Sequence, residues 1–145
     1  MSPRTLVKAC ERAGLETIAV TDHHTIRGAL EVREIAPFPV IVGAELRAAE
    51  GEIIGLFLEK EIPRGLPALE TVKRIKDQGG IVQIPHPYDT FRRKHIQEQA
   101  LIDILPYVDI IEAFNARTTL KSDLEKGVRF IERYGRPRGI LPTGV

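Results

Sequence analysis

The sequence predicts a single α/β domain with a mainly parallel sheet, either open or closed into a barrel. Short apolar runs alternate with segments of helical apolar spacing along the 145 residues. The apolar runs predict strands at 17–20, 40–45, 52–58, 81–85 and 108–113. The helical spacing predicts helices at 3–13, 26–35, 68–78, 96–105 and 122–134. Ionisable residues follow three of the strands, as expected where parallel strands end at a functional edge.

Local signals support the first and last helices. Ser2 can cap the first helix, with Pro3 at its first position. Ser122 and Glu125 have the spacing of a capping box, so we expect the last helix to start there. No element is predicted for residues 136–145.

Composition narrows the classes of protein to consider. Twenty-one basic and 20 acidic residues give a formal net charge of +1, so charge does not indicate binding to nucleic acid or acidic membranes. No apolar run is long enough to span a bilayer, and no signal-peptide pattern is present at the N-terminus, so we expect a cytoplasmic protein. Cys10 is the single cysteine, which excludes an internal disulfide and a cysteine zinc site and favours a buried thiol.

The segment 21–28 is the densest in potential chemistry, because an acid, two imidazoles and two hydroxyls fall within five positions. His23 and His86 each follow a predicted strand, and Glu45 is the last residue of another. A carboxylate can bridge two cations and a neutral imidazole offers one nitrogen, so the set suits a transition-metal cluster. A single histidine would more often cap a strand end, but the three residues together favour a metal site.

Side-chain alternation tests this interpretation. It places three sets of residues on one face of the sheet, each ending in a possible ligand. These sets are Ala19, Thr21 and His23; Ile41, Gly43 and Glu45; and Val82, Ile84 and His86.

Four ordered motifs resemble the PHP family, the polymerase and histidinol phosphatase superfamily of metal-dependent phosphoesterases. They are TDHHTIRG at 21–28, VGAEL at 42–46, GGIVQIPHP at 79–87 and IIEAFN at 110–115. The resemblance spans residues 1–135 of a single domain over 1–145, and 136–145 form a divergent tail. It implies a TIM-like, parallel (β/α)7 barrel with a cluster of divalent metals. In that cluster His23 and His86 would be ligands and Glu45 the bridging carboxylate.

The resemblance also suggests roles for neighbouring residues. Asp22 should point away from His23, so we expect it to act through hydrogen bonds behind the ligands. His24 could be an extra ligand or a proton carrier, but we favour a hydrogen bond behind the ligands. Glu112 and Asn115 are expected on opposite faces of their strand, and the family likeness favours Asn115 in the cavity as a substrate contact.

Arg117 could hold a substrate phosphate, although a solvated surface arginine is about equally plausible. The charged run 91–95 could form a phosphate-attracting lip, but we favour a solvated loop face.

The chain departs from the family pattern at both ends. The family's first strand carries a His-x-His pair that has no counterpart here, and residues 136–145 lack the family's final Asp-x-His. We therefore expect a partial barrel with an open seam, belonging to a fragment or a degenerate member.

The expected activity is hydrolysis of a phosphate monoester or nucleotide phosphodiester by metal-bound hydroxide, with Mn, Zn or Fe as the metal. The alternative is a catalytically inactive PHP-like fragment that serves as an interaction or regulatory module. An open-sheet protein with unrelated histidines remains a third possibility. The sequence does not indicate the oligomeric state.

Overall fold

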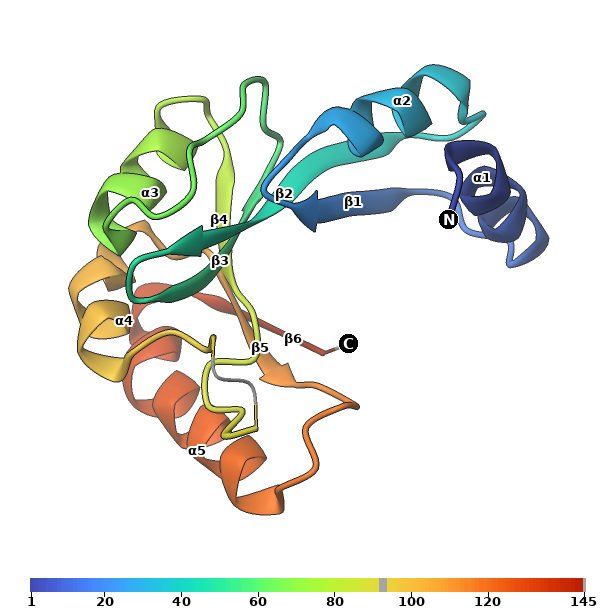
Figure 1. Ribbon diagram of the computed structural model, residues 1–145. Coiled ribbons are helices and arrows are strands. Elements are labelled where there is room, and N and C mark those ends of the chain that lie inside the picture. The colour runs from blue at the N-terminus through green and yellow to red at the C-terminus, as the bar shows by residue number, and fades with distance from the viewer. Residues whose placement is uncertain (92–93, 145) are drawn as a thin grey trace.

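The computed structural model describes residues 1–91 and 94–144, and over these residues the chain forms one curled six-stranded sheet with flanking helices (Figure 1). The strands are β1 (Ile18–His23), β2 (Val40–Ala48), β3 (Gly51–Leu56), β4 (Ile81–Ile84), β5 (Ile110–Phe114) and β6 (Leu141–Gly144). The α-helices are α1 (Pro3–Arg12), α2 (Arg27–Ile35), α3 (Ala68–Lys76), α4 (Glu98–Ile104) and α5 (Lys121–Phe130). Shorter helical turns are η1 (Leu105–Tyr107), η2 (Ile131–Gly135) and η3 (Arg136–Arg138).

The sheet is mixed, so the prediction of an all-parallel barrel is wrong at β3. The strands follow chain order from β1 to β6, and β3 runs antiparallel to both β2 and β4 while the other pairs are parallel. Only Ala49 and Glu50 separate β2 from β3. A parallel connection needs a crossover of a dozen or more residues, so this short turn can form only a hairpin.

The curled sheet forms a half-barrel. In the described part of the chain, β1 and β6 lie at the two ends of the strand order and each pairs with one neighbour. Figure 1 shows α3, α4 and α5 together along one side of the sheet. The arrangement is compatible with the partial barrel expected from the sequence.

The prediction that residues 136–145 form no element is also wrong. After Gly139, which adopts the left-handed conformation at φ +71°, the chain turns into β6 and pairs in parallel with β5. The sequence signal for this strand is weak because Pro142 and Gly144 lie within it, and both residues disfavour strands.

One helix start is confirmed and one is corrected. Ser2 caps α1 by accepting a hydrogen bond from the Thr5 N–H. The capping box predicted at Ser122 does not form, because α5 already begins at Lys121 after a Leu120 N-cap that has no side-chain bond. Ser122 therefore lies within the first turn of α5.

The core lies between the sheet and the helices. Helix α2 packs on β1 and β2, α3 packs on β3 and β4, and α5 packs on β5. Alternate strand residues are buried on this side, and each large one stabilises the fold by about 1.5–3 kcal/mol. They include Val20, Val42, Ala44, Leu46, Val82, Ile84 and Ile111, and Cys10 is also buried as predicted. Among the described residues, no helix has the length and apolar character that a membrane span requires.

The strand register tests the predicted faces. His23 pairs with Glu45 and Thr21 pairs with Gly43, so the predicted faces of β1 and β2 are confirmed. The prediction for β4 is wrong. Glu45 pairs with Ile54, and Ile54 pairs with Gln83, so Gln83 lies on the face of the sheet that carries Glu45. Val82 and Ile84 therefore lie on the opposite face, on the side of the helices. His86 lies beyond the end of β4, where strand alternation no longer determines its direction.

Candidate metal centre

His23 and Glu45 are brought together by the pairing of β1 with β2. They are register partners at the C-terminal end of β1, and the His23 Nδ1 atom lies 3.5 Å from Glu45 Oε2. The His23 side chain is 65% exposed and that of Glu45 is 18% exposed. One side of this pair is therefore accessible from solvent.

Glu52 is a third member that the sequence analysis missed. His23, Glu45 and Glu52 each offer a ligand-type atom within 4.8 Å of the others. Glu52 pairs with Arg47 across the hairpin, which places its carboxylate on the same face as Glu45. The short turn before Gly51 could have predicted this position, because a hairpin there places Glu52 on the same face as Glu45.

His86 approaches the same carboxylates from the loop after β4. Its Nε2 atom lies 3.7 Å from Glu45 Oε1 and 3.5 Å from Glu52 Oε2. The His86 side chain is only 3% exposed, and neither ring nitrogen has a hydrogen-bond partner among the described residues. A buried polar atom without a partner is costly. Glu45 therefore lies near both predicted histidines, and the three residues whose ligand-type atoms all lie within 4.8 Å of one another are His23, Glu45 and Glu52.

Glu112 fixes the backbone of His86. The buried Glu112 Oε2 atom accepts hydrogen bonds from the His86 N–H at 2.7 Å and from Asn115 Nδ2 at 3.1 Å. His86 has φ +29°, a conformation that non-glycine residues rarely adopt and that persists when surrounding contacts enforce it. The Glu112 bond supplies such a contact.

We predicted that Glu112 and Asn115 point to opposite faces of their strand. Their side chains instead hydrogen-bond directly, so they do not point away from each other. The register of β5 shifts between Glu112 and Phe114, and this irregularity breaks the alternation on which the prediction depended. Asn115 Oδ1 also accepts the Arg117 N–H at 2.9 Å, and the Arg117 side chain is exposed. The substrate-binding roles of Asn115 and Arg117 remain predictions.

His24 supports β2 through its backbone and its ring. At φ +63°, its N–H donates to the Glu45 carbonyl at 3.1 Å, and its Nδ1 accepts the Arg47 N–H at 3.4 Å. Burial lowers the pKa of His24, and nearby His23 lowers it further. A neutral ring is consistent with Nδ1 as an acceptor.

Asp22 points to the other face of β1, because the strand continues through His23. Its carboxylate lies directly against Gly28 in the first turn of α2, where a side chain on Gly28 would collide with it. The role of Asp22 behind the ligands stays a prediction.

The donor atoms of His23, Glu45 and Glu52 could hold a divalent metal ion. Ligands bound about 2.1 Å from a tetrahedral cation lie about 3.4 Å from one another. The separations of three individual nitrogen–oxygen pairs, 3.5, 3.7 and 3.5 Å, are close to that spacing. Glu45 directs one carboxylate oxygen toward each histidine, an arrangement in which one carboxylate can serve two cations. Nitrogen and carboxylate donors together suit Zn, Mn or Fe.

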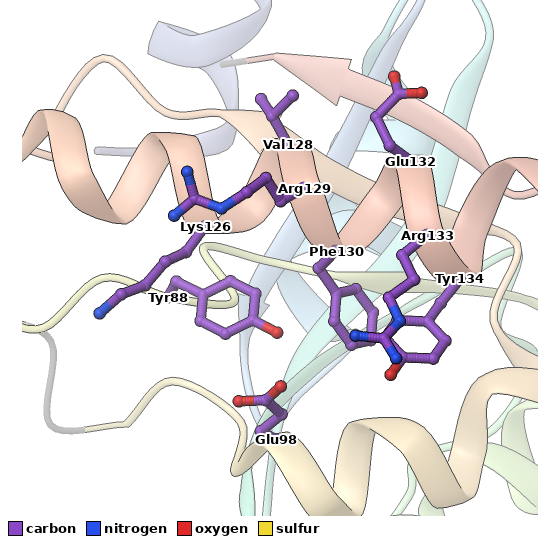
Figure 2. Close-up of a pocket in the computed structure, with 9 residues that line it drawn as sticks. All are labelled: Tyr88, Glu98, Lys126, Val128, Arg129, Phe130, Glu132, Arg133 and Tyr134. Carbon is purple, nitrogen blue, oxygen red and sulfur yellow. The ribbon is translucent and has the colours of Figure 1, made fainter.

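A groove of about 750 Å³ is lined by residues of α5 and η2, by Tyr88 and by Glu98 at the start of α4 (Figure 2). Figure 2 shows the rings of Tyr88, Phe130 and Tyr134 along it, with charged side chains around them. Burial raises the pKa of Tyr88 above its ordinary value, and nearby Glu98 adds to the shift. None of the nine residues lining this groove belongs to the His23, Glu45, Glu52 and His86 cluster, and we place the candidate site at that cluster.

Comparison with known proteins gives relatives without an assigned activity. Two uncharacterized proteins of Methanocaldococcus jannaschii, MJ1587 and MJ0417, are 41% and 35% identical over 119 and 97 residues. The matches cover 79% and 65% of this chain, and 66% and 41% of the relatives. The chain thus spans just under two thirds of the length of one relative and about two fifths of the other. No protein-family profile matches the sequence.

A solved structure from Bifidobacterium adolescentis shares the fold. It is named as a "putative metal-dependent phosphoesterase", and it superimposes with a TM-score of 0.75 at 17% identity. The match covers 99% of this chain and 80% of that one. At this level of identity the likeness shows the α/β fold.

Proposed function

We propose that this chain is a metal-dependent phosphoesterase domain of the PHP type, with His23, Glu45, Glu52 and His86 as the metal ligands. The observation that carries the proposal is the buried His86 ring, which has no hydrogen-bond partner among the described residues and faces two carboxylates. The shared fold with a protein named for this activity supports the same class.

The reaction follows from the chemistry of the ligands. A bound divalent cation would polarise a phosphate ester and lower the pKa of a coordinated water toward neutrality. One Glu45 oxygen faces His23 and the other faces His86, so this carboxylate could bind a cation beside either histidine. Glu112 contributes by holding the His86 backbone in place through its 2.7 Å hydrogen bond.

The substrate is a phosphate monoester or a nucleotide phosphodiester that approaches from the exposed side of His23. Arg117 and Asn115 lie on the loop after β5, near Glu112, and are candidates to contact it. The metal is Mn, Zn or Fe, since all three accept nitrogen and oxygen donors.

The test combines metal content with turnover. The purified chain is loaded separately with each metal, its bound metal is quantified, and hydrolysis of p-nitrophenyl phosphate and its bis ester is followed. We expect retained metal and hydrolysis for the wild type. His23→Ala, Glu45→Ala and His86→Ala should each lose both, because each removes a donor atom from the centre.

Glu34→Ala is the matched control, because Glu34 is an exposed glutamate on α2. It should behave as the wild type. Unchanged metal content in all three ligand variants would contradict the metal centre. Retained metal without hydrolysis of either ester would contradict the phosphoesterase assignment alone.

A further inference from the structure

Lys94 lies at the mouth of the candidate metal centre. Its Nζ atom is 3.9 Å from Glu52 Oε1, while the other Glu52 oxygen faces His86 Nε2 at 3.5 Å. The Lys94 side chain is 50% exposed and that of Glu52 is 8% exposed. Its ammonium group therefore stands between a buried carboxylate and solvent.

The backbone around Lys94 is anchored to the hairpin. The Glu52 N–H donates to the Lys94 carbonyl at 2.9 Å, and the Gln97 N–H donates to the Glu50 carbonyl at 2.9 Å. Ile96, between these bonds, is buried against Gly51, where a Cβ atom would collide with its backbone. The loop thus holds the start of the Lys94 side chain at a defined distance from Glu52.

Arg47 adds a second positive charge to the same region. It follows Glu45 by two residues on β2 and pairs with Glu52, so it lies on the face that carries the cluster. Arg47 and Lys94 both line a hollow of about 190 Å³. Glu50 also lines it, but its Oε2 accepts the Ala68 N–H at 2.7 Å at the start of α3.

We propose that Lys94, together with Arg47, binds the anionic phosphate group of the substrate in this hollow beside the metal ligands. The inference rests on the proposed function and assigns its phosphate-binding residues. Two residues along a strand advance about 6.6 Å, so Arg47 lies one such step beyond Glu45. An ammonium and a guanidinium are the side-chain groups that bind phosphate most strongly. Lys94 also neutralises Glu52 when no cation is bound.

The experiment measures metal binding and anion binding separately. Manganese is titrated calorimetrically into the metal-free chain, and inorganic phosphate is then titrated into the manganese-saturated protein. Lys94→Met keeps an unbranched side chain of similar length and removes the charge, and Lys94→Arg keeps the charge. Lys121→Met is the matched control, because Lys121 is 91% exposed on α5. Thermal melting of each variant checks its fold.

We expect Lys94→Met to weaken phosphate binding on the order of tenfold, the loss expected for one charge-assisted hydrogen bond. Manganese affinity should stay the same or increase, because a neighbouring positive charge is removed. Lys94→Arg should retain phosphate binding, Arg47→Met should weaken it, and Lys121→Met should leave it unchanged.

Three other outcomes would contradict the inference. Equal phosphate affinity in Lys94→Met and Lys121→Met would show that Lys94 does not bind the anion. A parallel loss of manganese and phosphate binding in Lys94→Met would place its effect on the metal ligands instead. Absence of binding by the wild type to manganese, and to zinc and iron titrated in its place, would overturn the proposed function and this inference with it.

Discussion

The two halves of the candidate metal centre are built in different ways. His23, Glu45 and Glu52 come from adjacent paired strands, where the register alone aligns their side chains. His86 comes from a loop after β4, in a left-handed conformation that a buried hydrogen bond to Glu112 accompanies. One half is positioned by secondary structure and the other by a buried polar contact.

This difference indicates which changes each half tolerates. The strand half should withstand loss of single polar contacts, because many backbone hydrogen bonds keep its residues aligned. The loop half depends on a few buried groups, and removing one leaves a donor or acceptor unsatisfied. The following predictions test this contrast.

The largest effect is expected at the residue shared by both halves. Glu45→Gln keeps the size of the side chain but removes its charge, and Glu45 contacts both His23 and His86. Metal affinity should fall by more than about 100-fold, because changes behind the ligands alone cost about 10–100-fold. Equilibrium titration with manganese measures the fall, and an affinity equal to that of the wild type would show that Glu45 is not a ligand.

Gly51 of β3 packs against Ile96 of the loop that follows His86, and a substitution at Gly51 should disrupt this contact. A Cβ there would collide with the backbone of Ile96, and the residue has φ +147°. Gly51→Ala should lower the free energy of unfolding by about 3 kcal/mol or more.

Gly79→Ala is the control, because Gly79 has φ +72° and open space around it. Its cost should be only about 1–2 kcal/mol. Urea unfolding compares the two variants. Equal losses would show that strain at the glycine, rather than the approach of Ile96, determines the effect.

The loop half is tested at Glu112. Glu112→Ala removes the acceptor of the His86 N–H and should lower metal affinity by about 10–100-fold. It should also lower stability by about 1–3 kcal/mol, because a buried N–H is left unpaired.

Glu112→Gln retains an acceptor oxygen, so its metal affinity and its stability should both lie between those of Glu112→Ala and the wild type. Glu11→Ala, at an exposed glutamate of α1, should change neither. Metal affinity that is unaffected by Glu112→Ala would mean that the loop holds His86 without this bond.

The smallest expected effect concerns Asp123, which supports the loop at a distance from the ligands. The hydrogen bond from the Thr90 N–H lowers the pKa of Asp123, although burial opposes the shift. A lowered folded-state pKa stabilises the protein above the unfolded value of about 3.9, and this stabilisation is lost as the pH falls through the folded-state pKa.

Asp123→Asn should therefore reduce stability at neutral pH, and its difference from the wild type should shrink as the pH falls below about 4. Urea unfolding across this range measures the difference. A difference that does not vary with pH would contradict the role of the ionised carboxylate.

The sequence predicted the parts of the molecule that depend on local patterns. The alternating elements and the faces of β1 and β2 follow from apolar spacing, and this was enough to bring His23 and Glu45 together. The two-residue turn before Gly51 carried the information for an antiparallel β3 and for Glu52, but the hairpin was not inferred from it.

Other features depend on contacts between distant segments. The direction of His86 is set by φ +29° and by a carboxylate that lies 26 residues away, so alternation along β4 could not predict it. The pairing of β6 with β5 likewise depends on the sheet edge that β5 offers, because Pro142 and Gly144 are weak strand signals.

Anomalous diffraction from crystals of the chain soaked in manganese or zinc tests the central claim most directly. We predict at least one anomalous peak among the side chains of His23, Glu45, Glu52 and His86, about 2.0–2.3 Å from the donor atoms that bind the metal. Crystals of Glu45→Gln should lack the peak. An anomalous map with no peak among these four side chains, at a metal concentration that saturates binding in solution, would contradict the account.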